Sequence, residues 1–277
     1  MRLDKDMVLG GRVVWVGKSS MDIRMEVIDS DGQDCLVAHF FFVARSPFTK
    51  KAMPVNPLAP VSSLDRELFL DGEKRAAERK TRGRQAATEA EEARRAQWVA
   101  EMMDKAQIAE DMPALVKAGW IWRRDTTHEN MLMCQPQQRN MAGRIFGGFL
   151  MRRAFELAFT TCYSFAGSRP AFLLVDDISF RLPVDVGDLL RLKSCVLHVE
   201  HKEGRGPPWL GSQPTHAVVH VEVTAAVVKP EQASSHVTNT FQFRFAVDNS
   251  ERGLKRIMAR TRDEAEEMYK AASQHWQ

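Results

Sequence analysis

The chain has 277 residues, of which 44% are apolar and 27% charged, and its formal net charge is +3. This composition is ordinary for a globular protein, and the length suits one large domain or two small ones with a proper core. It excludes a strongly basic nucleic-acid binder, and no apolar run approaches the roughly 18 residues of a membrane-spanning helix.

Four cysteines are spread widely along the chain, at Cys35, Cys134, Cys162 and Cys195. They form no CxxC pair and have no histidine nearby at metal-site spacing, so we expect buried free thiols in a reducing compartment. The sequence thus predicts neither a metal site nor a cofactor. The N-terminal stretch has the composition of neither a secretion signal nor a transit peptide, so it contains no targeting segment that can be read.

The first predicted elements are three antiparallel strands. Residues 7–16 and 20–28 alternate apolar and polar side chains, and the connector at 17–19 suits a hairpin turn. Asp31 and Gly32 form a second turn signal, and residues 35–44 read as a third, largely buried strand. The proline-rich stretch at 47–60 predicts a surface connector.

Residues 64–106 change to helix formers in which basic and acidic side chains alternate in similar numbers. Such a segment is either a partner-binding or nucleic-acid-binding helix, or a solvated linker helix with i,i+4 ion pairs. The balance of charge favours the solvated linker. Trp98, Met102 and Met103 indicate that its far end packs against another element.

The centre of the chain is the stretch from Asn140 to Leu157. After a short strand at 131–136, it runs through Gly147 and Gly148 into a helix with an apolar stripe, which we expect to end near residue 163. Paired glycines let a backbone approach a ligand closely, and the start of a helix offers unpaired N–H groups to a polarised oxygen. Close packing of the helix on a sheet would also explain the two glycines.

Four strands follow the helix, with a turn at 185–188 between the first two and a glycine- and proline-rich loop at 202–214. Residues 251–277 read as a polar, peripheral amphipathic helix. A helix followed by long antiparallel strands predicts an α+β fold in which the sheet wraps around a central helix.

The three opening strands resemble the last three strands of the second half. The pairs are RVVWVGKSS with SCVLHVEHK, MDIRMEVID with AVVHVEVTA, and CLVAHFFFVAR with TNTFQFRFAV. The glycine motif, a helix and one further strand precede this set only in the second half. We therefore expect a first repeat that lacks its own central helix.

The motif N-x-x-G-x-x-x-G-G at 140–148, followed by a helix and long strands, resembles the double hot-dog acyl-CoA thioesterases of the mitochondrial acyl-CoA thioesterase 9 type. GSRP at 167–170, VDDISFRLPVDVGDLL at 175–190, VGKSSMDIRMEV and FFFVARSP carry the same resemblance. It implies a tandem hot-dog of four parts. These are a partial first repeat (1–48), a linker with a long charged helix (49–127), a complete second repeat (128–248) and a helical tail (249–277).

The resemblance also implies a catalytic pair, an asparagine from one repeat and an aspartate from the central helix of the other. Asn140 occupies the asparagine position, while Phe155, with Glu156 beside it, stands where the aspartate would be. Backbone N–H groups at Gly147 and Gly148 would stabilise the oxyanion of thioester hydrolysis. Glu156 is the nearest carboxylate to act as base, although a solvated helix carboxylate would look the same.

For the substrate, the resemblance assigns acyl-CoA, with Gly143, Arg144, Phe146 and Arg169 as candidate contacts. Surface charge explains the two arginines equally well. It further implies a homo-oligomer without nucleic acid, in the mitochondrion. A truncated, non-catalytic hot-dog subunit that binds acyl-CoA or only assembles with partners is the alternative. A hot-dog hydratase is disfavoured, because no histidine lies near the motif.

We expect Asp176 and Asp177, at the start of a strand, to be structural. The strand histidines at 198, 216, 220 and 236 show no ligand spacing, and we expect them to be satisfied within the sheet.

Overall fold

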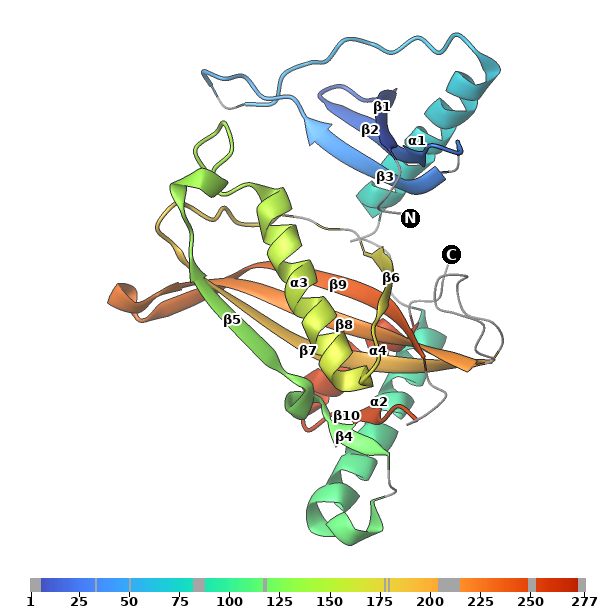
Figure 1. Cartoon of the computed structure of the whole chain (residues 1–277), viewed down its shortest axis with the longest axis vertical. Helices are drawn as coiled ribbons and strands as arrows, with labels where there is room; N and C mark the ends of the chain where they lie inside the picture. Colours follow the sequence, from blue (N-terminus) through green and yellow to red (C-terminus); the bar gives the residue numbers. More distant parts are fainter. Residues whose placement is uncertain are drawn as a thin grey trace. The chain divides into compact units, whose positions relative to one another are not determined.

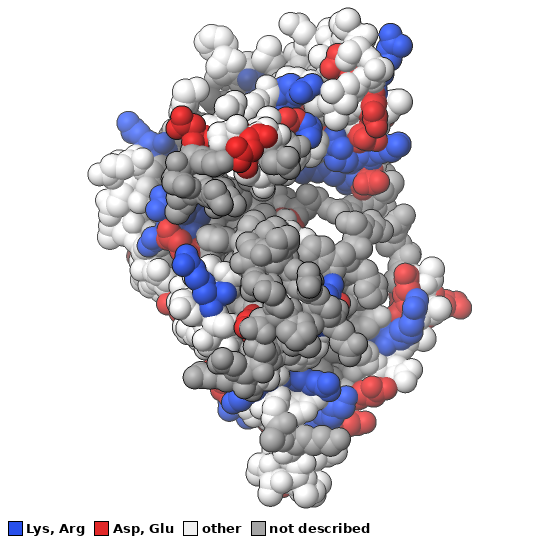
Figure 2. Space-filling view, turned by 45° about the vertical axis from the view of Figure 1, so that its right-hand side comes forward, with Lys and Arg blue, Asp and Glu red and all other residues white. Residues whose placement is uncertain are grey.

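The structure, a computed structural model, divides the chain into two compact units, residues 1–87 and 88–277 (Figure 1). The residues whose structure is described are 6–32, 34–49, 51–81, 88–116, 119–176, 178, 180–203, 215–248 and 253–273. Basic and acidic side chains are interspersed over the surface visible in Figure 2, which agrees with the small net charge of +3.

The first unit contains a three-stranded antiparallel sheet in the order β1-β2-β3. Its strands are β1 (Met7–Val16), β2 (Ser20–Asp29) and β3 (Asp34–Val43). The three predicted strands and both turns are confirmed. The third strand was expected to be largely buried, and this prediction is wrong: Leu36, Phe40 and Phe42 are exposed, because β3 lies at the edge of the sheet. The second turn contains Gly32 at φ 77°, a backbone conformation that favours glycine.

Helix α1 (Ser63–Thr81) packs on this sheet. Gly72 makes the close approach possible, since a Cβ atom there would lie 2.4 Å from the Cβ of Trp15. A buried carboxylate strengthens the contact: both oxygens of Asp22 lie within hydrogen-bond distance of His39, and one accepts from Arg75 of α1.

The charged segment was expected to be one solvated linker helix, and this prediction is wrong. It forms two helices, α1 in the first unit and α2 (Glu89–Asp111) in the second. Thr88 and Glu91 form a capping box that begins α2. Sparse apolar side chains at helical spacing then bury one face of it, at Val99, Met102, Ala106 and Ala109.

The second unit is built on a five-stranded antiparallel sheet in the order β5-β7-β8-β9-β6. These strands are β5 (His128–Met133), β6 (Ala171–Val175), β7 (Leu189–Glu203), β8 (Thr215–Lys229) and β9 (Ser234–Asp248). Helix α3 (Gly147–Ala166) lies across one face (Figure 1). Alternate side chains of β9, Phe241, Phe243 and Phe245, are buried in the core that it covers. The expected α+β fold, a sheet around a central helix, is therefore confirmed in this unit. The loop predicted at 202–214 lies mostly outside the described residues.

The opposite face of the sheet carries helix α4 (Arg262–Ser273), which packs on β7 and on α2. Residues 251–277 were expected to form a polar, peripheral amphipathic helix. An amphipathic helix with one exposed face is confirmed, but it begins only at Arg262. Its stripe of Ala265, Met268 and Ala271 is at most 1% exposed, because it covers the side chains of β7 that point away from α3.

A short parallel pair of strands completes the described part of the unit, β4 (Trp120–Trp122) with β10 (Arg256–Met258). Single 3-10 turns lie at Pro113–Leu115, Arg123–Thr126 (η2), Pro136–Gln138 and Pro230–Gln232.

Among the helices of the described residues, none combines the length and the apolar character needed to cross a membrane. The four cysteines are free, as predicted, with Cys35 half-buried and the others buried.

Candidate active site at the start of helix α3

Asn140 closes a tight loop immediately before α3. Its backbone N–H donates to the Arg144 carbonyl over 2.6 Å, and its carbonyl accepts from Gly143, which adopts φ 82°. The side-chain oxygen accepts from the N–H groups of Ala142 at 2.8 Å and Arg144 at 3.2 Å. Asn140 is thus a turn residue, and its side-chain oxygen is fixed by its own loop.

The side-chain nitrogen of Asn140 is placed differently. Within the part of the chain that the structure describes, this NH₂ group forms no hydrogen bond, and the residue is only half-buried. An amide whose oxygen is held and whose nitrogen is open presents two N–H donors in a defined direction. The turn and a binding role are therefore compatible in the same side chain.

Hydrogen bonds hold the loop to the 3-10 turn before it and to the segment that precedes β7. Phe146 N–H donates to the Gln138 carbonyl at 2.8 Å, and Ile145 N–H donates to the Val184 carbonyl at 2.9 Å. Arg144 pairs with Asp185 through a β-bridge and a long ion pair of 3.7 Å. These bonds fix the direction in which the chain enters α3.

The predicted turn at 185–188 lies beside this entry point. Gly187 has φ 92°, and its N–H donates to the Cys134 carbonyl. Burial raises the pKa of Cys134 to about 11, so this thiol stays protonated at neutral pH and is no nucleophile.

Gly147 and Gly148 begin α3 between two aromatic rings. A Cβ atom on Gly147 would lie 2.7 Å from the Phe180 ring, and one on Gly148 would lie 2.4 Å from the Phe146 ring. Phe149 and Leu150 both donate to the Phe146 carbonyl, whereas the N–H groups of the two glycines make no hydrogen bond within the described residues. The glycines thus permit close aromatic packing and also expose two aligned donors at a helix start.

Phe155 lies in an aromatic cluster between α3 and the sheet. Its ring centroid is 5.4 Å from that of Phe172 and 5.9 Å from those of Phe243 and Phe245. The position at which the resemblance would place an aspartate therefore contributes to the core of this unit.

Glu156 faces the helix surface. It accepts hydrogen bonds from Arg152 at 3.0 Å and from Arg153 at 2.8 Å, and its side chain is 41% exposed. It lies about 12 Å along the axis from Gly148, given a helical rise of roughly 1.5 Å per residue. The structure therefore does not bring Glu156 to Asn140, and its surroundings are those of a solvated ion pair.

Of the other residues that the sequence singled out, Arg169 also lies away from the start of α3. Arg169 is exposed and follows Gly167, the residue with φ 69° that ends α3, so about 30 Å of helix separates it from Arg144. Asp176 lies 3.7 Å from Arg244, as a structural residue would. Asp177 lies outside the described residues. Of the predicted substrate contacts, only Gly143, Arg144 and Phe146 gather at the start of α3.

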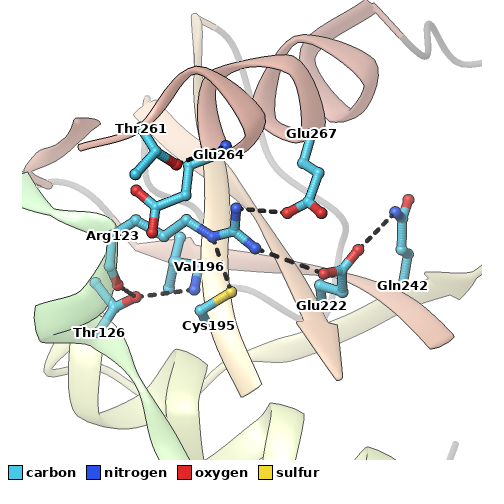
Figure 3. A network of polar contacts seen from close by, with 9 residues as sticks. All are labelled: Arg123, Thr126, Cys195, Val196, Glu222, Gln242, Thr261, Glu264 and Glu267. Carbon is cyan, nitrogen blue, oxygen red and sulfur yellow. Dashed lines mark hydrogen bonds and ion pairs between the residues drawn. The ribbon is translucent and has the colours of Figure 1, made fainter. Parts of the chain in front are cut away.

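A buried charge network that sequence reasoning missed lies on the other face of the sheet (Figure 3). Arg123 of η2 donates to Cys195 Sγ at 3.2 Å and to Glu267 of α4 at 2.6 Å, and it lies 3.6 Å from Glu222 of β8. Gln242 of β9 donates to Glu222. No local pattern reveals these contacts, because the partners are far apart in sequence.

The pKa shifts of the charged groups indicate that this network has a structural role. Burial raises the pKa of Glu222 and that of Cys195, more than the neighbouring guanidinium lowers them. Burial also disfavours the Arg123 cation, but Cys195 and Glu267 outweigh that cost and raise its pKa. A permanent cation joins η2, β8 and α4 there.

The histidines lie within or beside the sheet, and the His198 and His220 rings meet edge to face at 5.6 Å. Burial, with Arg244 and His198 nearby, lowers the pKa of His220 to about 3. Its Nε2 atom is buried and forms no hydrogen bond among the described residues, so the expectation of satisfied histidines is wrong at this position. In the described part of the chain, no three His, Cys, Asp or Glu side chains gather as metal ligands would.

The sequence is similar to those of several curated enzymes. It is 47% identical over 255 residues to acyl-coenzyme A thioesterase 2, chloroplastic, of Humulus lupulus. This match covers 88% of this chain and 55% of the relative. It is 42% identical to the mitochondrial acyl-coenzyme A thioesterase 4 of the same plant, over 88% of this chain and 46% of the relative. For the human mitochondrial acyl-coenzyme A thioesterase 9, the identity is 34% over 87% of this chain and 53% of the relative. The chain thus spans about half the length of these relatives.

No protein-family model matches the chain. Among solved structures, it is similar to an acyl-CoA hydrolase from Staphylococcus aureus, with a TM-score of 0.46 and 18% identity over 56% of this chain and 87% of that one. At that TM-score the likeness does not establish the fold, which follows instead from the strand order and the position of α3. Over about half of their length, the chain is thus similar in sequence to three acyl-coenzyme A thioesterases, the class of enzymes that its glycine motif and strand pattern resemble.

Proposed function

We propose that this chain hydrolyses acyl-CoA thioesters to a free acid and CoA. The observation that carries the proposal is the 47% identity, over 88% of the chain, to a relative named as an acyl-coenzyme A thioesterase. The chain spans about half of that relative, so the activity named for the whole relative is itself a proposal for this chain.

Thioester hydrolysis places negative charge on the carbonyl oxygen when water attacks the carbonyl carbon. In our proposal this oxygen lies against the open N–H groups of Gly147 and Gly148 at the start of α3. The helix dipole and the two aligned donors favour the oxyanion over the neutral carbonyl. Collapse of the tetrahedral intermediate then breaks the C–S bond and releases the CoA thiolate, which takes up a proton.

Asn140 holds the attacking water in this proposal. Its side-chain oxygen is occupied by Ala142 and Arg144, so the group offered to the water is the amide nitrogen. An N–H donor to a lone pair of the water orients the other lone pair toward the carbonyl carbon. The proton of that water goes to a carboxylate acting as general base.

Exposed apolar side chains around the start of α3 suit an acyl group. Their exposed fractions range from 39% to 106%, and they come from β5, the Asn140 loop and the segment before β7. They are Met133, Met141, Phe146, Phe180, Leu182 and Val186. A cluster of this kind on a surface marks a site for an apolar ligand or partner.

The second candidate is a non-catalytic subunit that binds acyl-CoA or assembles with partners. It is favoured by Phe155, which fills the position of the expected aspartate, and by the ion pairs that occupy Glu156. Under the first proposal, the base is a carboxylate of another copy in a homo-oligomer, for which Glu156 is the candidate once it is released from its arginines, because within one chain it lies too far from the start of α3. As for location, we propose an organelle, with the mitochondrion named for two of the three relatives and the chloroplast for the third.

Thiol release from a panel of acyl-CoAs tests the two candidates on the whole chain. Asn140→Asp keeps the side-chain oxygen that caps the loop but removes the N–H donors, whereas Asn140→Ala removes both. Asn130→Asp on β5, an exposed asparagine, is the matched control. We expect both Asn140 variants to lose about 100-fold or more in kcat/KM, a typical effect of one catalytic polar group, and the control to keep it.

Full activity of Asn140→Asp would reject the role of the amide nitrogen. Absence of hydrolysis in the unmodified chain, with acyl-CoA binding intact, would favour the non-catalytic subunit. Glu156→Gln completes the set: its effect on the rate, at unchanged stability, decides whether that carboxylate is the base.

A further inference from the structure

One face of the sheet in the first unit carries a row of basic side chains. Arg12 of β1 is paired with Arg24 of β2, and Arg24 is paired with His39 of β3, so the three lie side by side across the strands. Like charges directly opposite each other on a sheet destabilise it unless an anion lies between them.

The carboxylates nearby leave part of this charge uncompensated. Both oxygens of Asp22 are engaged by His39 and Arg75, and Glu26 forms its ion pair with Arg24. Arg12 forms no ion pair among the described residues. Hydrogen bonds with Ser62 chiefly, and the charge of Arg12 to a lesser extent, lower the pKa of Asp65 at the start of α1. Arg12 therefore acts on that carboxylate only from a distance.

A hollow of about 250 Å³ opens at this row, lined by Gly10, Gly11, Arg12, Arg24 and Glu26. Gly10 faces Glu26 across the strands, and a Cβ atom on Gly10 would meet nothing within 4 Å. A glycine in the interior of a strand often marks a place where a ligand approaches the backbone. At this position the glycine leaves open the space that a side chain would fill, beside two guanidinium groups.

We propose that this hollow binds the phosphate group of a small molecule, between the guanidinium groups of Arg12 and Arg24. Arg12 can donate two N–H groups to such an anion, and Arg24 shares its guanidinium group between the anion and Glu26, whose carboxylate also lines the hollow. The volume is below the roughly 300–1,000 Å³ of sites that enclose drug-sized ligands, so it suits one phosphate group rather than a whole cofactor. The site belongs to the first unit alone and does not depend on the proposed hydrolysis.

Three variants of the whole chain distinguish the contribution of the Arg12 charge from that of the open volume beside Gly10. Arg12→Gln removes one guanidinium and leaves the hollow, whereas Gly10→Val keeps both arginines and fills it. Gly10→Val suits a strand, because the space is open and the backbone is not left-handed. Lys74→Gln is the matched control, since it removes one cation from α1 whose side chain is 74% exposed.

The measurement is the broadening of the phosphorus-31 resonance of inorganic phosphate and of methyl phosphate, titrated at constant ionic strength and pH 7.5. We expect binding by the unmodified chain and by Lys74→Gln. Arg12→Gln and Gly10→Val should each bind about tenfold more weakly or not at all, as the loss of charge-assisted hydrogen bonds predicts. Binding of methyl phosphate would identify a phosphorylated molecule as the source of the group, and binding of inorganic phosphate alone would identify the free ion.

Equal binding by all four proteins would overturn the proposal, because it would mean that the phosphate lies elsewhere. Absence of binding by the unmodified chain would overturn it too. The acyl-CoA assay on the same samples gives an independent result. If hydrolysis fails while phosphate binding depends on Arg12 and Gly10, only the proposed function is rejected.

Discussion

The ring of Phe155 on α3 meets the ring of Phe172 on β6 edge to face, with 5.4 Å between the centroids. The same ring also touches two phenylalanines of β9. Phe155 is partly buried, and a carboxylate in its place would lose these ring contacts and lie against apolar rings without a partner. The central helix of this unit is therefore built to pack at the position where the resemblance expects a catalytic acid.

Phe155→Asp should consequently destabilise the second unit without increasing hydrolysis. The lost packing is worth about 2 kcal/mol, less than for a fully buried phenylalanine because Phe155 is partly buried, and the carboxylate among apolar rings adds to it. Urea unfolding followed by tryptophan fluorescence measures the loss, and thiol release measures the activity. Phe155→Leu, which keeps most of the apolar volume, should cost less than half as much. A stable and more active Phe155→Asp variant would refute the packing role.

Gly148→Ala tests the aromatic packing at the start of α3. The added methyl group would overlap the Phe146 ring, but this ring is 58% exposed and can swing outward. We expect the free energy of unfolding to fall by about 1 kcal/mol, at the low end for overpacking. The KM for acyl-CoA should rise, because the displaced Phe146 ring is a candidate substrate contact. Asn130→Asp, at an exposed position of β5, is the control. Unchanged KM in Gly148→Ala would separate the glycine from substrate binding.

The regular strands and α3 could be predicted because each has a local signal. Period-2 alternation marks β1, β2 and β7 to β9, a short apolar run marks β3, and the paired glycines followed by an apolar stripe mark α3. The turn at 185–188 was also predictable, since Gly187 needs the positive φ that it adopts. The domain boundaries and the missing helix of the first repeat stay predictions.

The predictions that failed concern elements whose local sequence pattern is weak and whose position is determined by contacts with residues far away in the chain. The packing of the far end of the charged segment was predicted from Trp98, Met102 and Met103 and is confirmed, but its division into α1 and α2 was not predicted. Helix α4 buries a narrow stripe among many charges, so its sequence looks solvated although Met268 is almost fully buried. Arg123 reaches partners 72 and 144 residues away in the chain. At the candidate site, the sequence indicated the loop and the glycines, but only the structure showed that Glu156 points into an ion pair away from them.

Arg123→Met tests the buried network. It leaves Glu222, whose side chain is 13% exposed, without its cation, and such losses cost about 3–5 kcal/mol. Arg262→Met is the control, because that arginine is 73% exposed and its ion pair with Glu266 is worth at most about 0.5 kcal/mol. Hydrolysis per folded molecule should stay unchanged in both variants. If instead Arg123→Met abolishes hydrolysis while the unfolding free energy is unchanged, the network is not structural.

His220 should make the stability of the second unit depend on pH. Burial, together with Arg244, His198 and Lys202, lowers its pKa to about 3, whereas an unfolded histidine titrates near 6.5. Between these values the unfolded chain binds a proton that the folded chain does not. The free energy of unfolding should therefore be highest above pH 6.5 and fall as the pH drops, by up to about 1.4 kcal/mol per unit from this group.

His220→Phe removes the titrating group while keeping a ring against His198. Because Nε2 of His220 is buried without a hydrogen bond among the described residues, the variant should be as stable as the unmodified chain at pH 7, or more so. Its stability should then fall less steeply toward pH 5 in urea unfolding. His236→Phe, at an exposed position of β9, should keep the original slope. Parallel slopes in all three proteins would mean that another group carries the pH dependence.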